Sequence, residues 1–289
     1  MSQPIVCDTI DPARNGNASA PLIVLGPSLG TTDGLWAGVI PRLAETHRVL
    51  RFDLPGHGRS PSVTESFTLE EVADAVVDRV DSLGVRTFHY AGVSLGGAIG
   101  LALAVNRPER VASLAMFCSG AKIGTHEAWN NRAKIVRARG TSALRAGSAA
   151  RWFAPSFLGR DPQAGANALD ELLDIDDESY ALACEALADF DQTDAVSGIR
   201  VPVLCVSGEY DTVTPTAQLR ALAAEIPGAE ATVVAGSAHL PSLERPAEVG
   251  RLLVDWVARA TRSISRSNDG LDSLDSTALR ASKGYPRHG

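Results

Sequence analysis

Short apolar runs alternate with amphipathic stretches along the first part of the chain. The runs typical of strands covered on both faces are residues 21–25, 49–53, 85–91 and 111–118. Between them, Thr68 and Glu71 form a capping box that predicts the start of a helix, which runs to Val80 with valines on one face. Residues 98–105 predict a buried helix, and residues 4–12 an edge strand. Alternating strands and helices predict a parallel, doubly wound sheet.

The pattern changes in the middle of the chain. Residues 123–195 contain no clear strand and are rich in alanine, arginine and acidic residues, which favours several helices. Strand patterns resume at 203–207 and 231–234, and helices are predicted over 215–226 and 246–262. Helices inserted between sheet strands indicate a cap over the carboxyl ends of the strands, where such sheets bind ligands.

The chain is therefore predicted to contain a core, a cap and a tail. Residues 1–122 and 196–262 form the core, and residues 123–195 form the helical cap. Residues 263–289 are rich in Ser, Asp and Arg, nearly lack aromatic residues and show no periodicity. That composition is typical of a disordered tail.

A glycine-rich turn separates the strand that ends near residue 91 from the helix that follows. It reads Gly92-Val93-Ser94-Leu95-Gly96, the Gly-x-Ser-x-Gly pattern of a nucleophile elbow, in which a sharp turn exposes the serine hydroxyl. The Leu95 N–H then lies at a helix N-terminus, where it can stabilise a developing negative charge. The alternative is a glycine-rich turn with an incidental serine, so the elbow needs an acid and a base elsewhere in the chain.

Two later strands end in residues that can supply them. Asp211 follows the strand at 203–207 and His239 follows the strand at 231–234, so both reach the sheet edge that carries Ser94. In this triad His239 would take the Ser94 proton, and Asp211 would fix the imidazole tautomer. A helix N-cap for Asp211 and a loop histidine for His239 are the alternatives, but the order Ser, Asp, His at successive strand ends favours the triad.

The loop after the first parallel strand, residues 26–32, is predicted to complete an oxyanion hole. Its Leu29 N–H would be the second donor beside that of Leu95. A simple turn is the alternative. His57 lies between two glycines in another turn and is interpreted as structural rather than as a base.

Composition narrows the class of protein. The chain of 289 residues is 45% apolar and 21% charged, which is ordinary for a globular enzyme. A net charge of −7 without a basic run argues against nucleic acid as a partner. No segment predicts a membrane span or a signal core, so a cytoplasmic location is expected. The oligomeric state stays open.

The four cysteines are scattered without metal-ligand or disulfide spacing. Cys118 and Cys205 lie in apolar runs and are predicted to be reduced core residues. No cluster of metal ligands appears, so neither a metal nor an organic cofactor is expected.

These motifs resemble the α/β-hydrolase fold over residues 4–262 and, within it, the 3-oxoadipate enol-lactonase family. The family-like stretches are Ser28-Leu29-Gly30-Thr31, Gly92 to Gly97, Ala121-Lys122-Ile123-Gly124, Glu127-Ala128-Trp129-Asn130, Arg132, Arg151-Trp152-Phe153-Ala154-Pro155 and Phe157. The triad motifs identify only the superfamily, whereas the cap motifs are similar to the enol-lactonases in particular. The resemblance implies an α/β-hydrolase core with a helical cap.

The resemblance also implies the substrate, a small lactone that carries a carboxylate and opens to 3-oxoadipate without a cofactor. Trp129 and Arg132 would bind it, since they are three residues apart on one predicted helix face over 126–139. Packing for Trp129 and a solvated charge for Arg132 are the alternatives. Ser28 and Trp152, in other family-like stretches, are predicted as further substrate-binding residues.

Other functions use the same motifs. A carboxylesterase, a C–C hydrolase or a cofactor-free perhydrolase would have the same triad. A ligand receptor on a hydrolase scaffold would keep the triad but turn over very slowly. An acyl-enzyme and direct attack by water are both open as mechanisms.

Overall fold

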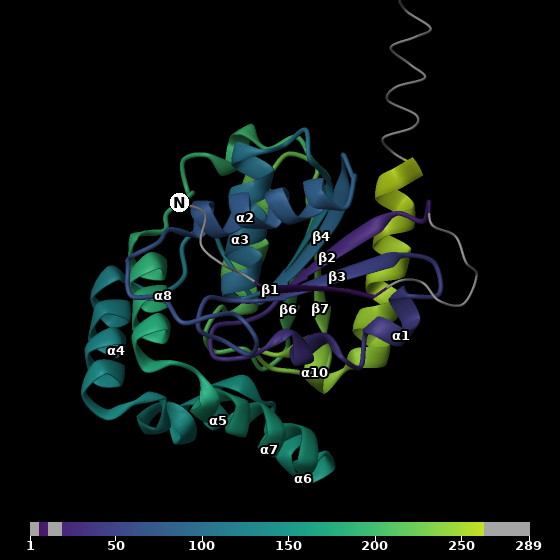
Figure 1. Cartoon of the computed structure of the whole chain (residues 1–289). Helices are drawn as coiled ribbons and strands as arrows, with labels where there is room; N and C mark the ends of the chain where they lie inside the picture. Colours follow the sequence, from purple (N-terminus) through teal and green to yellow (C-terminus); the bar gives the residue numbers. More distant parts are fainter. Residues whose placement is uncertain (1–5, 11–18, 263–289) are drawn as a thin grey trace, which may run out of the picture.

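One twisted sheet forms the centre of the molecule. The computed structural model describes residues 6–10 and 19–262, and within them seven strands lie in the order β1-β3-β2-β4-β5-β6-β7 (Figure 1). They are β1 (Val6–Ile10), β2 (Leu22–Gly26), β3 (Arg48–Asp53), β4 (Phe88–Val93), β5 (Val111–Phe117), β6 (Val203–Gly208) and β7 (Glu230–Val234). Only β1 runs antiparallel, against β3. The predicted parallel, doubly wound sheet is confirmed.

Helices cover both faces of this sheet. They are α1 (Ile40–Leu43), α2 (Leu69–Ser82), α3 (Leu95–Asn106), α9 (Thr216–Glu225), α10 (Pro241–Glu244) and a last helix over 246–262, with a short 3-10 helix η1 (Asp33–Trp36). In Figure 1, α2 and α3 lie on one side of the sheet, and α1 with the last helix lies on the other. The capping box of α2 is confirmed, because Glu71 N donates to Thr68 Oγ1 at 3.1 Å and Thr68 N donates to Glu71 Oε2 at 2.9 Å.

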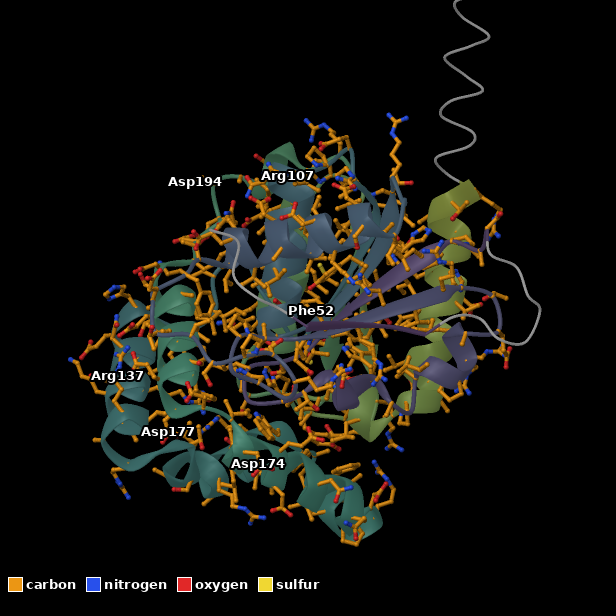
Figure 2. All side chains as sticks on the ribbon, in the orientation of Figure 1. Phe52, Arg107, Arg137, Asp174, Asp177 and Asp194 are labelled. Atoms are coloured by element: carbon orange, nitrogen blue, oxygen red, sulfur yellow. The ribbon has the colours of Figure 1, made fainter. Side chains whose placement is uncertain are left out.

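The core packs around α3 and the central strands. Every residue from 95 to 104 is buried, as are all residues of β2, β4 and β6. Phe52 on β3 is also fully buried (Figure 2). Strands covered on both faces need side chains that are apolar on both sides, which explains why their sequences are continuous apolar runs.

Strand β4 begins later than its sequence predicts. The pattern predicts a strand from residue 85, but β4 starts at Phe88. The carbonyls of Val85 and Arg86 instead accept hydrogen bonds from the Arg110 guanidinium, at 3.3 and 2.7 Å. The Arg110 side chain thus satisfies two backbone carbonyls that a longer strand would have paired with a neighbouring strand.

A block of helices lies between β5 and β6. It contains α4 (His126–Arg139), η2 (Thr141–Leu144), α5 (Arg145–Trp152), α6 (Phe157–Arg160), α7 (Pro162–Glu171), η3 (Leu172–Asp174), α8 (Asp177–Asp189) and η4 (Val196–Gly198). In Figure 1 the helices α4 to α8 gather beside the sheet, apart from α2 and α3. We refer to the segment over 123–195 as the cap.

Polar contacts join the two long cap helices. Arg137 on α4 pairs with Glu178 at 2.7 Å and with Glu185, both on α8 (Figure 2). Asp177, the first residue of α8, accepts a hydrogen bond from Thr141 N at 2.7 Å. Some of the arginines and acidic residues in this segment thus form ion pairs and hydrogen bonds within the cap.

The predicted tail over 263–289 lies outside the described residues. Among the helices that are described, none combines the length and the apolar character that a membrane crossing requires.

Candidate active site

Ser94 lies in a strained turn between β4 and α3. Its φ of 54° and ψ of −115° are in a region that residues other than glycine rarely adopt. Two hydrogen bonds hold this backbone in place, from Ser94 N to Phe117 O at 2.8 Å and from Ser119 Oγ to Ser94 O at 2.7 Å. Such strain persists only where the surroundings enforce it, and it is common at catalytic nucleophiles.

The glycines on each side of Ser94 are required by close backbone approaches. A Cβ atom at Gly92 would lie 2.2 Å from the Gly96 carbonyl oxygen, and one at Gly96 would lie 2.5 Å from the Gly26 carbonyl oxygen. Both obstacles are backbone atoms, which cannot move aside as a flexible side chain can. The structure therefore gives the steric reason for the Gly-x-Ser-x-Gly pattern.

Asp211 and His239 meet beyond the ends of β6 and β7. His239 Nδ1 lies 3.1 Å from each carboxylate oxygen of Asp211, and both side chains are buried. Burial raises the pKa of Asp211, but hydrogen bonds from His239, Thr214 and Val213 outweigh it and lower the pKa. An ionised Asp211 can only accept, so Nδ1 carries the proton and Nε2 is left as the basic nitrogen.

The structure brings Ser94 and His239 to the wall of one small cavity. Within the described residues no hydrogen bond yet joins Ser94 Oγ to the imidazole. Such contacts are often long in a site without substrate and tighten when the substrate binds. All three residues of the predicted triad therefore lie together at one edge of the sheet.

The cavity has a volume of about 30 Å³, enough for water but not for a lactone ring. Its lining residues are Ser28, Leu29, Ser94, Trp129, Arg132, Arg151, Trp152, Tyr180, Val213 and His239. This set includes all four predicted substrate-binding residues. A second hollow of about 390 Å³ shares Trp129, Arg132, Arg151 and Val213 with the cavity, so these four side chains stand between the two spaces.

Three lining residues were not predicted as site residues from the sequence: Arg151, Tyr180 and Val213. Arg151 is half-buried on α5, and Tyr180 is fully buried on α8. The available signal for Arg151 is its place in the family-like stretch that also contains Trp152. Nothing in the local pattern separates Tyr180 from an ordinary core residue.

The predicted oxyanion donors are the backbone amides of Leu29 and Leu95. Neither the Leu29 nor the Leu95 amide donates a hydrogen bond to any described residue. Leu95 is the first residue of α3, where the helix dipole favours negative charge. Leu29 lines the same small cavity as Ser94. Both N–H groups are thus free to donate to a ligand, one from the cavity wall and one from the residue after Ser94, and their role as oxyanion donors stays a prediction.

His57 holds the loop that carries Leu29. Its Nε2 accepts a hydrogen bond from Gly30 N at 3.2 Å, and its Nδ1 lies 2.9 Å from Pro55 O. Burial lowers the pKa of His57 to about 4, so the ring is neutral, with Nδ1 as the donor to the carbonyl. Gly30 has a φ of +87°, a conformation that suits glycine, and so the loop can present its amide to the ring. With both nitrogens engaged, His57 is a support for the loop and not a base.

Hydrogen bonds also link the cap to the loop that carries His239. The Trp152 carbonyl accepts hydrogen bonds from His239 N and Leu240 N, at 3.2 and 3.3 Å. The buried Glu244 carboxylate accepts from Ala154 N at 2.7 Å and from Ala238 N at 2.6 Å. The end of α5 and the His239 loop are therefore held as one unit.

Buried histidines predict a loss of stability in mild acid. Burial lowers the pKa of both His57 and His89 to about 4, from an ordinary 6.5. The unfolded chain binds these protons near pH 6.5 and the folded chain only near pH 4, so their stabilising effect is complete above 6.5 and falls between 6.5 and 4. The expected loss is about 3 kcal/mol for each histidine over that interval. Glu171 and Glu244, whose pKa burial raises, act in the opposite direction.

Urea unfolding at pH 7 and at pH 4.5 measures this effect, and His57→Gln is the matched variant. Glutamine has no group that titrates there, so the variant should be less stable at pH 7 but lose less of its stability on acidification. An equal loss for the variant and the parent chain would contradict the assignment to His57.

The sequence model of the alpha/beta hydrolase family matches residues 23–252. The chain is 34% identical over 238 residues to 3-oxoadipate enol-lactonase 1 of Acinetobacter baylyi, covering 82% of this chain and 89% of that protein. It is 31% identical to 3-oxoadipate enol-lactonase 2 of the same organism, covering 81% and 87%.

A solved structure gives the same result. The crystal structure of the enol-lactonase from Burkholderia xenovorans superimposes with a TM-score of 0.83 at 34% identity. The match covers 88% of this chain and 96% of that chain. The matched part therefore includes the cap as well as the sheet.

Proposed function

Since the chain belongs to the alpha/beta hydrolase family, and within it to the 3-oxoadipate enol-lactonases, we propose that it hydrolyses 3-oxoadipate enol-lactone to 3-oxoadipate. The hydrolase activity follows from the family, and the substrate is the part proposed. One observation carries the substrate: Arg132 and Trp129 line the same cavity as Ser94 and His239. A cationic and an aromatic side chain beside a nucleophile suit a small ring that bears a carboxylate.

In the first half of the proposed reaction, Ser94 Oγ attacks the ring carbonyl while His239 Nε2 takes the hydroxyl proton. The negative charge that forms on the carbonyl oxygen is stabilised by the Leu29 and Leu95 amides. The ring C–O bond then breaks, and His239 returns the proton to the leaving oxygen. That oxygen leaves as an enol, which becomes a ketone, so the ring opening is hard to reverse.

In the second half, water replaces the enol as the partner of His239. His239 takes a proton from water, the hydroxide attacks the acyl carbon, and the proton passes back to Ser94 as the ester bond breaks. One water is consumed for each lactone opened, and the new carboxylate is released with the substrate's own carboxylate unchanged. Asp211 supports the imidazolium form of His239 in both halves.

In this proposal Arg132 binds the substrate's carboxylate. Its Cζ lies 5.5 Å from the centre of the Trp129 ring, and Trp129 is held by a hydrogen bond from Nε1 to Ile123 O. No acidic side chain pairs with Arg132 in the described part of the chain. Its charge is therefore available to an anion that enters from the 390 Å³ hollow.

Arg132→Ala should lower kcat/KM for the carboxylate-bearing lactone, because a charge-assisted, paired contact is lost. The loss of transition-state stabilisation calculated from the two kcat/KM values should be about 2–4 kcal/mol. Hydrolysis of a small neutral ester should change little, since that substrate does not use the guanidinium. Arg132→Lys should recover only part of the loss, because an ammonium group cannot make the paired contact. Steady-state kinetics on both substrates measures the difference. Equal losses on the two substrates would instead indicate a disturbed cap.

The direct test of the function is the spectrophotometric loss of the enol-lactone with purified protein. Many turnovers per molecule would support a hydrolase and exclude a slow ligand receptor. A neutral aryl ester serves as the comparison. A kcat/KM far higher for the aryl ester than for the enol-lactone would overturn the proposed substrate in favour of a carboxylesterase.

A further inference from the structure

We propose that Arg151 and Arg132 together form a binding site for dicarboxylates, and that this site retains the dianionic product of the reaction. The inference rests on the proposed function, which supplies a product with two carboxylates. It adds a second cationic residue, a preference for dianions, and inhibition by product.

The two arginines come from different cap helices and face the same space. Arg132 lies on α4 and Arg151 on α5. Both line the small cavity with Ser94 and His239, and both line the 390 Å³ hollow beside it. Each is half-buried, so the two positive charges are partly withdrawn from water.

Three other cap arginines are neutralised or engaged within the protein. Arg137 pairs with Glu178 and Glu185, Arg145 pairs with Asp170, and Arg160 donates to the Glu244 carbonyl. Neither Arg132 nor Arg151 has an acidic partner among residues 19–262. Burial and the nearby charge of Arg132 lower the pKa of Arg151. Two like charges at one cavity therefore lack a counter-charge, and an anion in the hollow would supply it.

The surroundings leave room for the Arg151 guanidinium and add a neutral donor. A Cβ atom at Gly147, one turn earlier on α5, would lie 3.0 Å from an Arg151 guanidinium nitrogen. Tyr180 lines the same cavity and is fully buried, and its hydroxyl has no hydrogen-bond partner in the described ranges. Burial raises the pKa of Tyr180, so the hydroxyl keeps its proton and can donate to a carboxylate oxygen.

The reaction itself creates the second charge. A lactone with one carboxylate is a monoanion, and hydrolysis of its ester bond yields a second carboxylate where the carbonyl lay beside Ser94. One guanidinium suffices for the substrate, whereas two match the product. The site should therefore hold a dicarboxylate of suitable length more tightly than a monocarboxylate of the same length.

The probes are adipate and hexanoate, which have six carbons and differ in one carboxylate, with glutarate and pentanoate as a shorter pair. Isothermal titration calorimetry on the full chain should show adipate binding about tenfold more tightly than hexanoate. Arg151→Met should abolish that advantage while leaving hexanoate affinity nearly unchanged. Arg139→Met, an exposed arginine of the same cap outside both hollows, is the control and should keep the advantage.

Circular dichroism and the Tm of each variant verify folding, and Arg151→Gln replaces Arg151→Met if the latter is unstable. Adipate binding no tighter than hexanoate, or a preserved advantage in a folded Arg151 variant, would overturn the site. The enol-lactone assay keeps the two proposals apart. Dicarboxylate preference without turnover would refute the proposed function alone, and turnover without the preference would refute the two-arginine site alone.

Discussion

Ser94→Ala is expected to lower kcat on the enol-lactone at least a thousandfold, to about 10⁻³ of the parent rate or less. The hydroxyl of Ser94 is the attacking atom in the proposed mechanism, and His239 and Asp211 act only through it. The residual rate would come from the oxyanion amides of Leu29 and Leu95 and from substrate binding. The Tm should not fall, because the change removes no packing contact. Alanine also adopts a φ of 54° about as readily as serine does.

The same variant decides between the two possible mechanisms. An acyl-enzyme cannot form without the Ser94 oxygen, whereas direct attack of water activated by His239 would not need it. Near-normal turnover by a folded Ser94→Ala protein would therefore refute the acyl-enzyme. Rapid mixing of the parent chain with a slow aryl ester should in addition show a burst of one phenol per active site.

Asp211→Asn is expected to lower kcat by about 10⁴ while the fold is preserved. Asp211 accepts from His239 Nδ1, from Thr214 Oγ1 at 2.6 Å and from Val213 N at 2.8 Å. An asparagine amide group would donate to Nδ1 and so favour the tautomer with the proton on Nε2. The imidazole could then no longer take the Ser94 proton.

Asp191→Asn is the matched control for that loss. Asp191 is exposed and pairs with Lys122 at 2.8 Å, away from the catalytic cavity. The same chemical change there should leave kcat within about twofold, since exposed pairs contribute little. A similar rate for Asp211→Asn and Asp191→Asn would show that another acid orients His239.

The alternation of strands and helices could be predicted because it depends on local periodicity. The cap helix α4 runs over His126–Arg139, as its pattern predicts, since Thr125 accepts from Ala128 N and Gly140 ends it with a φ of +73°. The start of β4 could not be predicted, because the Arg110 guanidinium satisfies carbonyls that a strand would otherwise use. Local patterns do not contain such distant partners.

The residues of the site also divide into those that a local pattern predicts and those that depend on distant partners. Ser94, Asp211 and His239 follow strands, and the parallel sheet carries every strand end to one edge. Arg151 on α5 and Tyr180 on α8 reach the cavity through the tertiary packing of the cap, which no single segment specifies. The structural role of His57 could be predicted, but its partner Gly30 could not, because Gly30 lies 27 residues earlier in the chain.

The hydrogen bonds between the end of α5 and the His239 loop limit how new specificities can arise by exchange of segments. A recombinant that replaced all of residues 123–195 would also replace Trp152 and Ala154, whose backbone groups bind the His239 loop and Glu244. A crossover point placed before Arg145 would change α4, with Trp129 and Arg132, and keep that attachment. Libraries of this protein that vary α4 should retain activity far more often than chimeras that exchange the whole cap. The useful crossover point for directed evolution therefore lies inside the cap and not at its ends.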